Sequence, residues 1–158
     1  MRAMGAQPAP RWLQTPGAWL TLSERSIGYF HHMTHDEVQR WLDGYVAAWR
    51  SNDADDIRAL FSEDAVYSYR PWEDDDQTVR GSDAIVASWL EETDEPTVWD
   101  AEYHPYVVEG NKAVATGWSR YQARGEHPER TYHNAYLLEF DDEGRCNSFH
   151  EYYFLEGR

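Results

Sequence analysis

The chain has 158 residues, 15% of them aromatic, which suits one domain with a single sizeable core. Its net charge of −15 argues against a nucleic-acid or membrane partner, since phosphate backbones and anionic membrane surfaces attract lysine and arginine. The single cysteine, Cys146, excludes an internal disulfide and predicts a reducing, cytoplasmic location.

The N-terminal segment, residues 1–32, shows no helical or strand period and is interrupted by prolines. Directly after Met33 comes Thr34-His35-Asp36-Glu37, a capping box that opens a helix. We therefore interpret residues 1–32 as a disordered leader or an over-extended gene model, dispensable for folding, and residues 33–158 as the domain. The alternative is a genuine leader that packs on the domain.

Three helices are predicted in the first half of the domain. The first has apolar residues at helical spacing, namely Val38, Trp41, Leu42, Tyr45 and Trp49. Asp53 caps a second, short helix, whose buried residues are Ile57, Leu60 and Phe61. The third begins at Gly81-Ser82 and turns inward Ile85, Val86, Trp89 and Leu90. Between the last two helices, residues 65–69 alternate as a strand and residues 72–78 form a solvated loop.

Four extended segments follow, at residues 98–108, 113–123, 131–140 and 146–155. Short segments rich in glycine, asparagine, aspartate and glutamate separate them, as in strands that are linked by hairpins. Helices followed by a run of strands predict an α+β fold, in which the helices cover one face of an antiparallel sheet.

The sequence lacks the motifs of common cofactor and metal sites. It has no glycine-rich nucleotide loop, no His-Glu-x-x-His helix and no nucleophile elbow. The seven histidines are spread along the chain, and Asp74-Asp75-Asp76 lacks the spacing of a calcium loop. We therefore predict no metal ion and no cofactor.

Six short strings, in order along residues 34–155, resemble the nuclear-transport-factor-2-like (NTF2-like) superfamily and its SnoaL-like branch. They are Tyr45-Val46-Ala47-Ala48-Trp49 with Asn52-Asp53, Leu60-Phe61 with Asp64-Ala65-Val66-Tyr67, Gly81-Ser82-Asp83-Ala84-Ile85, Phe140-Asp141, Gly144-Arg145 and Glu151-Tyr152-Tyr153. The resemblance implies a cone-shaped fold, with three helices on a curved sheet that encloses a pocket. It also implies a homodimer through the other face of the sheet.

Ketosteroid isomerases of this superfamily match the chain at one of three functional positions. Tyr45 occupies the place of their oxyanion-binding tyrosine, whereas Tyr69 and Tyr136 stand where these enzymes carry two aspartates. The resemblance therefore implies that ketosteroid isomerisation of the usual kind, with an aspartate base, is not available.

Limonene-epoxide hydrolases also match in part. Tyr67 corresponds to their water-holding tyrosine, and Glu151 to the aspartate of their last strand. Gly117 and Ser119 replace an arginine and an aspartate, and Tyr69 replaces an asparagine. Without that arginine and the paired carboxylates, the usual opening of an epoxide is incomplete.

Strand alternation and the resemblance together predict the wall of the pocket. The predicted ligand-binding residues are Trp49, Tyr67, Tyr69, Trp89, Ser119, Tyr136, Phe149 and Tyr153. A pocket with this aromatic wall and few polar groups suits a flat, apolar or aromatic small molecule.

The predicted catalytic residues are Glu151, Tyr45 and Asn134. A carboxylate in an aromatic cavity loses solvation, so the pKa of Glu151 should rise into the range of a general base or acid. The alternative is that Glu151 is a structural strut, which forms an internal hydrogen bond or ion pair, for instance with a tyrosine or an arginine, and only supports its strand. Asn134 either orients a substrate or is a satisfied polar group of the core.

Two functions remain open on the sequence. The first is an enzyme that uses acid–base chemistry to isomerise, cyclise or hydrate a small molecule. The second is a non-catalytic ligand-binding or dimerisation module, which the missing carboxylate pairs favour.

Overall fold

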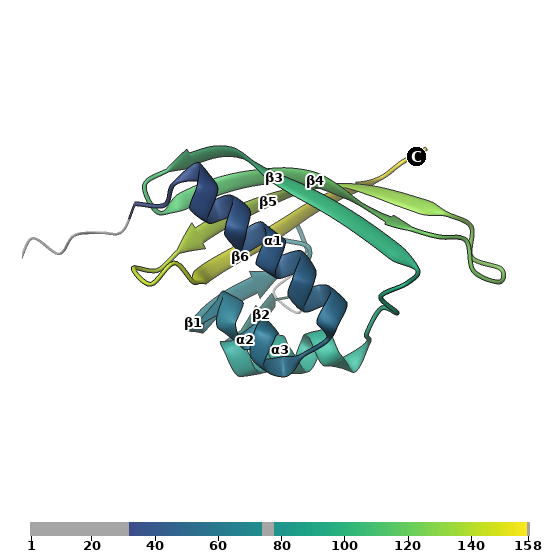
Figure 1. Cartoon of the computed structure of the whole chain (residues 1–158), viewed down its shortest axis with the longest axis horizontal. Helices are drawn as coiled ribbons and strands as arrows, with labels where there is room; N and C mark the ends of the chain where they lie inside the picture. The colour runs from purple at the N-terminus through teal and green to yellow at the C-terminus, as the bar shows by residue number, and fades with distance from the viewer. Residues whose placement is uncertain (1–31, 74–77, 158) are drawn as a thin grey trace, which may run out of the picture.

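A computed structural model describes residues 32–73 and 78–157 (Figure 1). The elements run in the order α1 (His35–Ser51), α2 (Ala54–Leu60), β1 (Phe61–Ser68), β2 (Thr78–Arg80), α3 (Ser82–Glu91), β3 (Trp99–Glu109), β4 (Lys112–Tyr121), β5 (Arg130–Phe140) and β6 (Cys146–Leu155). The predicted α+β fold, three helices on a curved sheet, is confirmed. Within the described ranges, no helix is long and apolar enough to cross a membrane.

Local signals place the first two helices. The Thr34 hydroxyl accepts a hydrogen bond from the Glu37 N–H at 3.3 Å, and the Glu37 carboxylate accepts one from the Thr34 N–H at 2.8 Å. Asn52 ends α1 in the left-handed conformation with φ of 52°. Asp53 then caps α2 by accepting hydrogen bonds from two backbone N–H groups of its first turn. Both helices therefore begin where the sequence predicts.

The sheet has six strands in the order β2-β1-β6-β5-β4-β3. The last four strands of the chain pair antiparallel, as predicted. Two features correct the sequence prediction: β1 pairs with β6 in parallel, and β2 begins at Thr78, where a loop is expected. Four strands, β2 to β5, and helix α3 lie in the chain between β1 and β6, a connection long enough for these two strands to pair in parallel. Residues 74–77 of the predicted loop lie outside the described residues.

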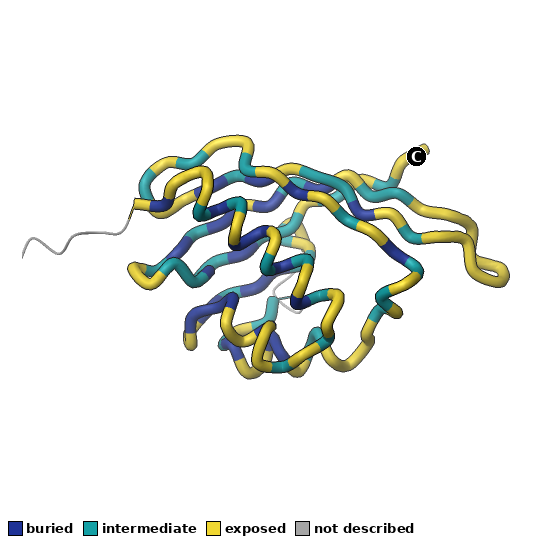
Figure 2. Tube along the Cα trace, in the orientation of Figure 1, coloured by how far each residue is buried: buried dark blue, intermediate teal, exposed yellow. Residues whose placement is uncertain are grey.

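The core lies between α1 and the concave face of the sheet. Figure 1 shows α1 crossing the strands, with α2 and α3 beside β1 and β2. In Figure 2 the buried residues gather where α1 and the strands face each other. Trp41 anchors α1 there: its ring packs edge-on against Phe61 and Phe140, and its indole N–H donates to the Leu60 carbonyl at 3.0 Å.

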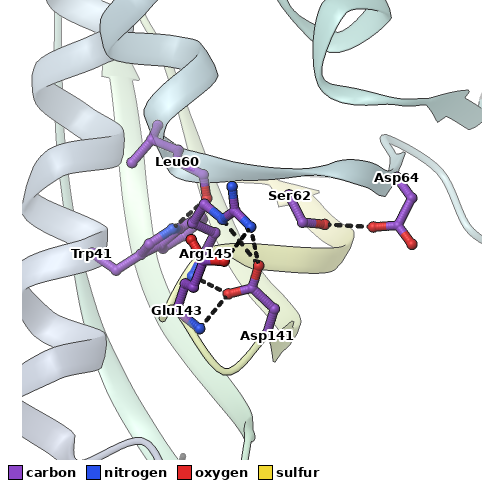
Figure 3. Close-up of polar contacts among 7 residues, drawn as sticks. All are labelled: Trp41, Leu60, Ser62, Asp64, Asp141, Glu143 and Arg145. Atoms are coloured by element: carbon purple, nitrogen blue, oxygen red, sulfur yellow. Dashed lines mark hydrogen bonds and ion pairs between the residues drawn. The ribbon is translucent and has the colours of Figure 1, made fainter.

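One aspartate holds the turn between β5 and β6 (Figure 3). One carboxylate oxygen of Asp141 accepts hydrogen bonds from the backbone N–H groups of Glu143 and Arg145, both at 2.9 Å. The other accepts one from the Arg145 guanidinium at 3.0 Å. None of the residues labelled in Figure 3 lines the cavity described below, so these contacts serve the fold.

The predicted leader lies outside the described residues, apart from His32, so its dispensability stays a prediction. Met33 belongs to the folded domain, since its N–H donates to the Gly110 carbonyl at 2.8 Å and its side chain is buried. A truncated protein should therefore keep Met33.

The outer face of the sheet exposes apolar side chains. Leu137, Tyr152 and Phe154 are 42%, 36% and 73% exposed. Trp118 lies on the same face, because it pairs with His133 on β5, which pairs in turn with Phe154 on β6. Because a patch of this kind marks an interaction surface, we expect a homodimer through this face. Light scattering at micromolar concentration should give twice the mass of one chain, and Phe154→Glu should give a monomer. A monomeric wild-type protein would contradict the prediction.

Candidate functional site

A cavity of about 510 Å³ lies between the helices and the concave face of the sheet. Alternate residues of a strand face the same side, so β4, β5 and β6 each turn a row of side chains into it. The predicted site residues that line it are Tyr45, Trp49, Tyr67, Tyr69, Trp89, Ser119, Asn134, Tyr136, Glu151 and Tyr153. Side chains distant in sequence thus share one wall.

Phe149 is the predicted ligand-binding residue that does not line the cavity. It is fully buried and stacks against Tyr67, with ring centroids 4.3 Å apart and planes 6° apart. A second stacked contact, at 5.5 Å, joins it to Tyr45. Phe149 faces inward as predicted, but the two tyrosines cover it. Phe149 therefore lies behind the wall of the cavity, so its predicted contact with a ligand would need these rings to move.

Glu151 lies at the centre of the site with Asn134 as its partner. The Asn134 amide donates a hydrogen bond of 2.6 Å from Nδ2 to Glu151 Oε1. Burial raises the pKa of Glu151 to about 7, and the hydrogen bond from Asn134 acts in the opposite direction. Among the described residues, no arginine or tyrosine pairs with the carboxylate, and its hydrogen bond from Asn134 fits a structural role for Glu151 as well as a catalytic one. The Asn134 carbonyl oxygen is buried without a partner there, so Asn134 is not a fully satisfied core amide.

Six tyrosines lie close enough to Glu151 for its charge to raise the pKa of their phenols, in addition to the larger effect of burial. They are Tyr45, Tyr67, Tyr69, Tyr103, Tyr121 and Tyr136. A raised pKa keeps every phenol protonated at neutral pH, so each hydroxyl is a hydrogen-bond donor. The hydroxyls of Tyr45 and Tyr67 bond to each other at 2.9 Å, which leaves one of their two hydrogens for a ligand.

Tyr103 also lines the cavity but is not among the predicted site residues. It pairs with Gly117 across β3 and β4, and a Cβ atom at Gly117 would lie 2.4 Å from the Tyr103 ring and 2.0 Å from the Glu102 carbonyl oxygen. Gly117 therefore does not leave open space for a ligand, because Tyr103 fills it. The alternation of Trp99, Ala101 and Tyr103 along β3 is the signal that could have identified this residue.

The mouth of the cavity is more polar than the sequence predicts. Asp94 accepts hydrogen bonds from the Trp49 indole at 3.2 Å and from the Tyr121 hydroxyl at 3.1 Å, which joins the loop after α3 to α1 and β4. Two arginines also line the cavity: Arg70 lies over the Tyr153 ring and Arg130 over the Tyr121 ring. The prediction of few polar groups is therefore corrected at the mouth.

Comparison with known proteins addresses the family and the fold. A family of proteins described as having a SnoaL-like domain matches residues 42–148. No curated protein has a matching sequence.

Several solved structures share the fold. A putative isomerase from Bacillus subtilis superposes with a TM-score of 0.59 at 16% identity, over 77% of this chain and 90% of that one. An LEH-like epoxide hydrolase from M. tuberculosis superposes with a TM-score of 0.55 at 16% identity, over 76% of this chain and 84% of that one. The epoxide hydrolase/cyclase-like enzyme SalBIII acts in pyran ring formation in the polyether salinomycin. It superposes with a TM-score of 0.56 at 15% identity, over 77% of this chain and 95% of that one. At these identities, the likeness concerns the fold alone.

Proposed function

Because this chain belongs to the SnoaL-like domain family, we propose that its cavity is the active site of an acid–base enzyme that acts on a flat small molecule, with Glu151 as the base. The observation that carries the proposal is the setting of this carboxylate. It lines an aromatic cavity, accepts a hydrogen bond from Asn134, and has a pKa raised by burial to about 7. Such a group can both take up and release a proton near neutral pH.

One carboxylate is sufficient for two kinds of reaction. In an isomerisation, Glu151 removes a proton from one carbon of the substrate and returns it to another. In a cyclisation, it removes a proton from a carbon or hydroxyl group, whose electron pair then attacks a carbonyl carbon of the same molecule. The π electrons of the carbonyl move to its oxygen, which finally takes the proton from Glu151. In both cases negative charge develops on a substrate oxygen. The proposed donor to that oxygen is the hydrogen left free in the Tyr45–Tyr67 pair.

Epoxide opening by water has weaker support than these two reactions. It needs an acid to protonate the leaving oxygen while a base activates water, and the enzymes that the sequence resembles use a second carboxylate and an arginine for this. Gly117 and Ser119 stand at those positions, and Tyr103 fills the space over Gly117.

A second candidate function is a non-catalytic ligand-binding module. Tyr69 and Gly117 favour it, because ketosteroid isomerases carry an aspartate and limonene-epoxide hydrolases an arginine at the matching positions. In this case, the cavity would hold a ligand without exchanging its protons.

Hydrogen exchange distinguishes the two candidates. The protein is incubated in D₂O with a panel of flat carbonyl compounds, and mass spectrometry follows deuterium entering their carbon–hydrogen bonds. We expect at least one compound to gain deuterium faster with protein than in buffer alone. Binding without exchange for every compound that binds would favour the ligand-binding module and contradict the enzyme.

A further inference from the structure

No cationic side chain of the described residues pairs with the Glu151 carboxylate. Among the described residues, the side chain that binds it is the neutral amide of Asn134, at 2.6 Å. Buried carboxylates in proteins are generally paired with a positive charge or a metal ion, because an unpaired buried charge is costly. Glu151 also lines an open cavity, so a partner can reach it from there.

The groups that face Glu151 are neutral or lie at the mouth. The phenols around it come from α1, β1, the segment that follows β1, β3, β4 and β5, and all are protonated at neutral pH. The other charged residues that line the cavity are Arg70, Arg130, Glu92 and Asp94, and all but Asp94 are exposed to solvent. Arg70 is paired with Glu73 at 3.3 Å, and Arg130 lies over the Tyr121 ring. Neither arginine is an ion-pair partner of Glu151.

The aromatic wall suits a positive charge as well as an apolar surface. Ring faces attract ammonium and guanidinium groups, most strongly where water is excluded. The rings of Tyr153 and Tyr121 already carry guanidinium groups at 5.9 and 5.8 Å from their centroids. The net charge of −15 also favours the approach of cations from solution.

We propose that the ligand of this cavity is a flat organic cation, in which a protonated amine or quaternary ammonium group pairs with Glu151 and the remaining surface packs on the tyrosine and tryptophan rings. The inference rests on the proposed function in placing the ligand beside Glu151, and it narrows the substrate to a nitrogen cation. It is tested by binding alone, so its outcome does not depend on turnover.

Cation binding should depend on pH in a defined direction. Since the pKa of Glu151 is about 7, the carboxyl group is mostly protonated at pH 6 and mostly ionised at pH 8. A cation that pairs with the ionised form must displace the proton at pH 6. Its affinity should therefore rise by up to about tenfold between pH 6 and pH 8. A neutral ligand should show no such rise.

Two probes of the same shape make the test. Phenyltrimethylammonium keeps its charge at every pH, and tert-butylbenzene is its neutral counterpart. Quenching of tryptophan fluorescence reports binding, since Trp49 and Trp89 line the cavity. At pH 8 we expect the cation to bind at least about tenfold more tightly than the neutral probe, an advantage of about 1.4 kcal/mol, and to weaken at pH 6.

Glu151→Gln should remove both the preference for the cation and its pH dependence. Glu63→Gln, which removes an exposed charge on β1 outside the cavity, should leave both unchanged. Should Glu151→Gln fail to fold, the pH series of the wild-type protein with both probes decides alone. Equal affinity for the two probes, a cation affinity independent of pH, or no cation binding at pH 8 would overturn the proposal. A lack of hydrogen exchange would overturn only the proposal that the protein is an acid–base enzyme.

Discussion

Replacing Glu151 by glutamine is expected to lower kcat by at least about 100-fold for any substrate that exchanges hydrogen in the cavity. The amide keeps the size of the side chain and can still accept the hydrogen bond from Asn134, but it cannot take up a proton near neutral pH. The rate is measured at saturating substrate, so that a change in affinity for a charged ligand does not affect it. Affinity for a neutral ligand should change by less than about threefold.

The pH dependence of the same reaction supplies the control. The base must be ionised, so kcat/KM should rise with pH, with a midpoint near 7, the pKa of Glu151 in the ligand-free protein. Asn134→Ala removes the hydrogen bond that lowers this pKa, so the midpoint should move to higher pH. This variant should also weaken substrate binding. Full activity of Glu151→Gln would show that another group is the base.

The same Glu151→Gln substitution is expected to stabilise the protein at pH 8. The free energy of unfolding of the variant, minus that of the wild type, should be about 3 kcal/mol larger at pH 8 than at pH 4. The pKa of Glu151 is about 7 in the folded protein, against an ordinary value of 4.5. Folding therefore favours the protonated form, and the stability that this gives the wild type is present below pH 4.5. It is lost as pH rises to 7, whereas a glutamine does not titrate.

Urea unfolding of the two proteins at pH 4, 6 and 8 measures this effect. The difference between them cancels the titration of all other groups, and Glu63→Gln serves as the exposed control. If Glu151 is instead a strut, the glutamine variant should be less stable than the wild type at pH 8. That result would restore the structural interpretation of the residue.

The sequence was sufficient for the elements whose signals are local. The capping box at Thr34 and the cap at Asp53 specify helix starts through bonds to residues two or three positions away. Strand alternation and the family resemblance together placed Glu151 and Asn134 on the inner face: successive side chains point to opposite sides of a sheet, and the resemblance indicated which side is inside. The cone-shaped fold and its pocket were predicted from the family resemblance, because the sequence shows the elements in the same order as that family.

Contacts between distant residues were decided only by the tertiary structure. No short turn connects β1 with β6, so their parallel pairing has no local signal in the sequence. The position of Tyr103 over Gly117 depends on the register in which β3 and β4 pair. The bond from Asn134 to Glu151, and the burial that raises the Glu151 pKa, likewise exist only once β5 and β6 lie together under α1. The sequence thus determined which side chains face inward, whereas packing determined which of them touch and which groups titrate near neutral pH, because desolvation depends on every element around the cavity.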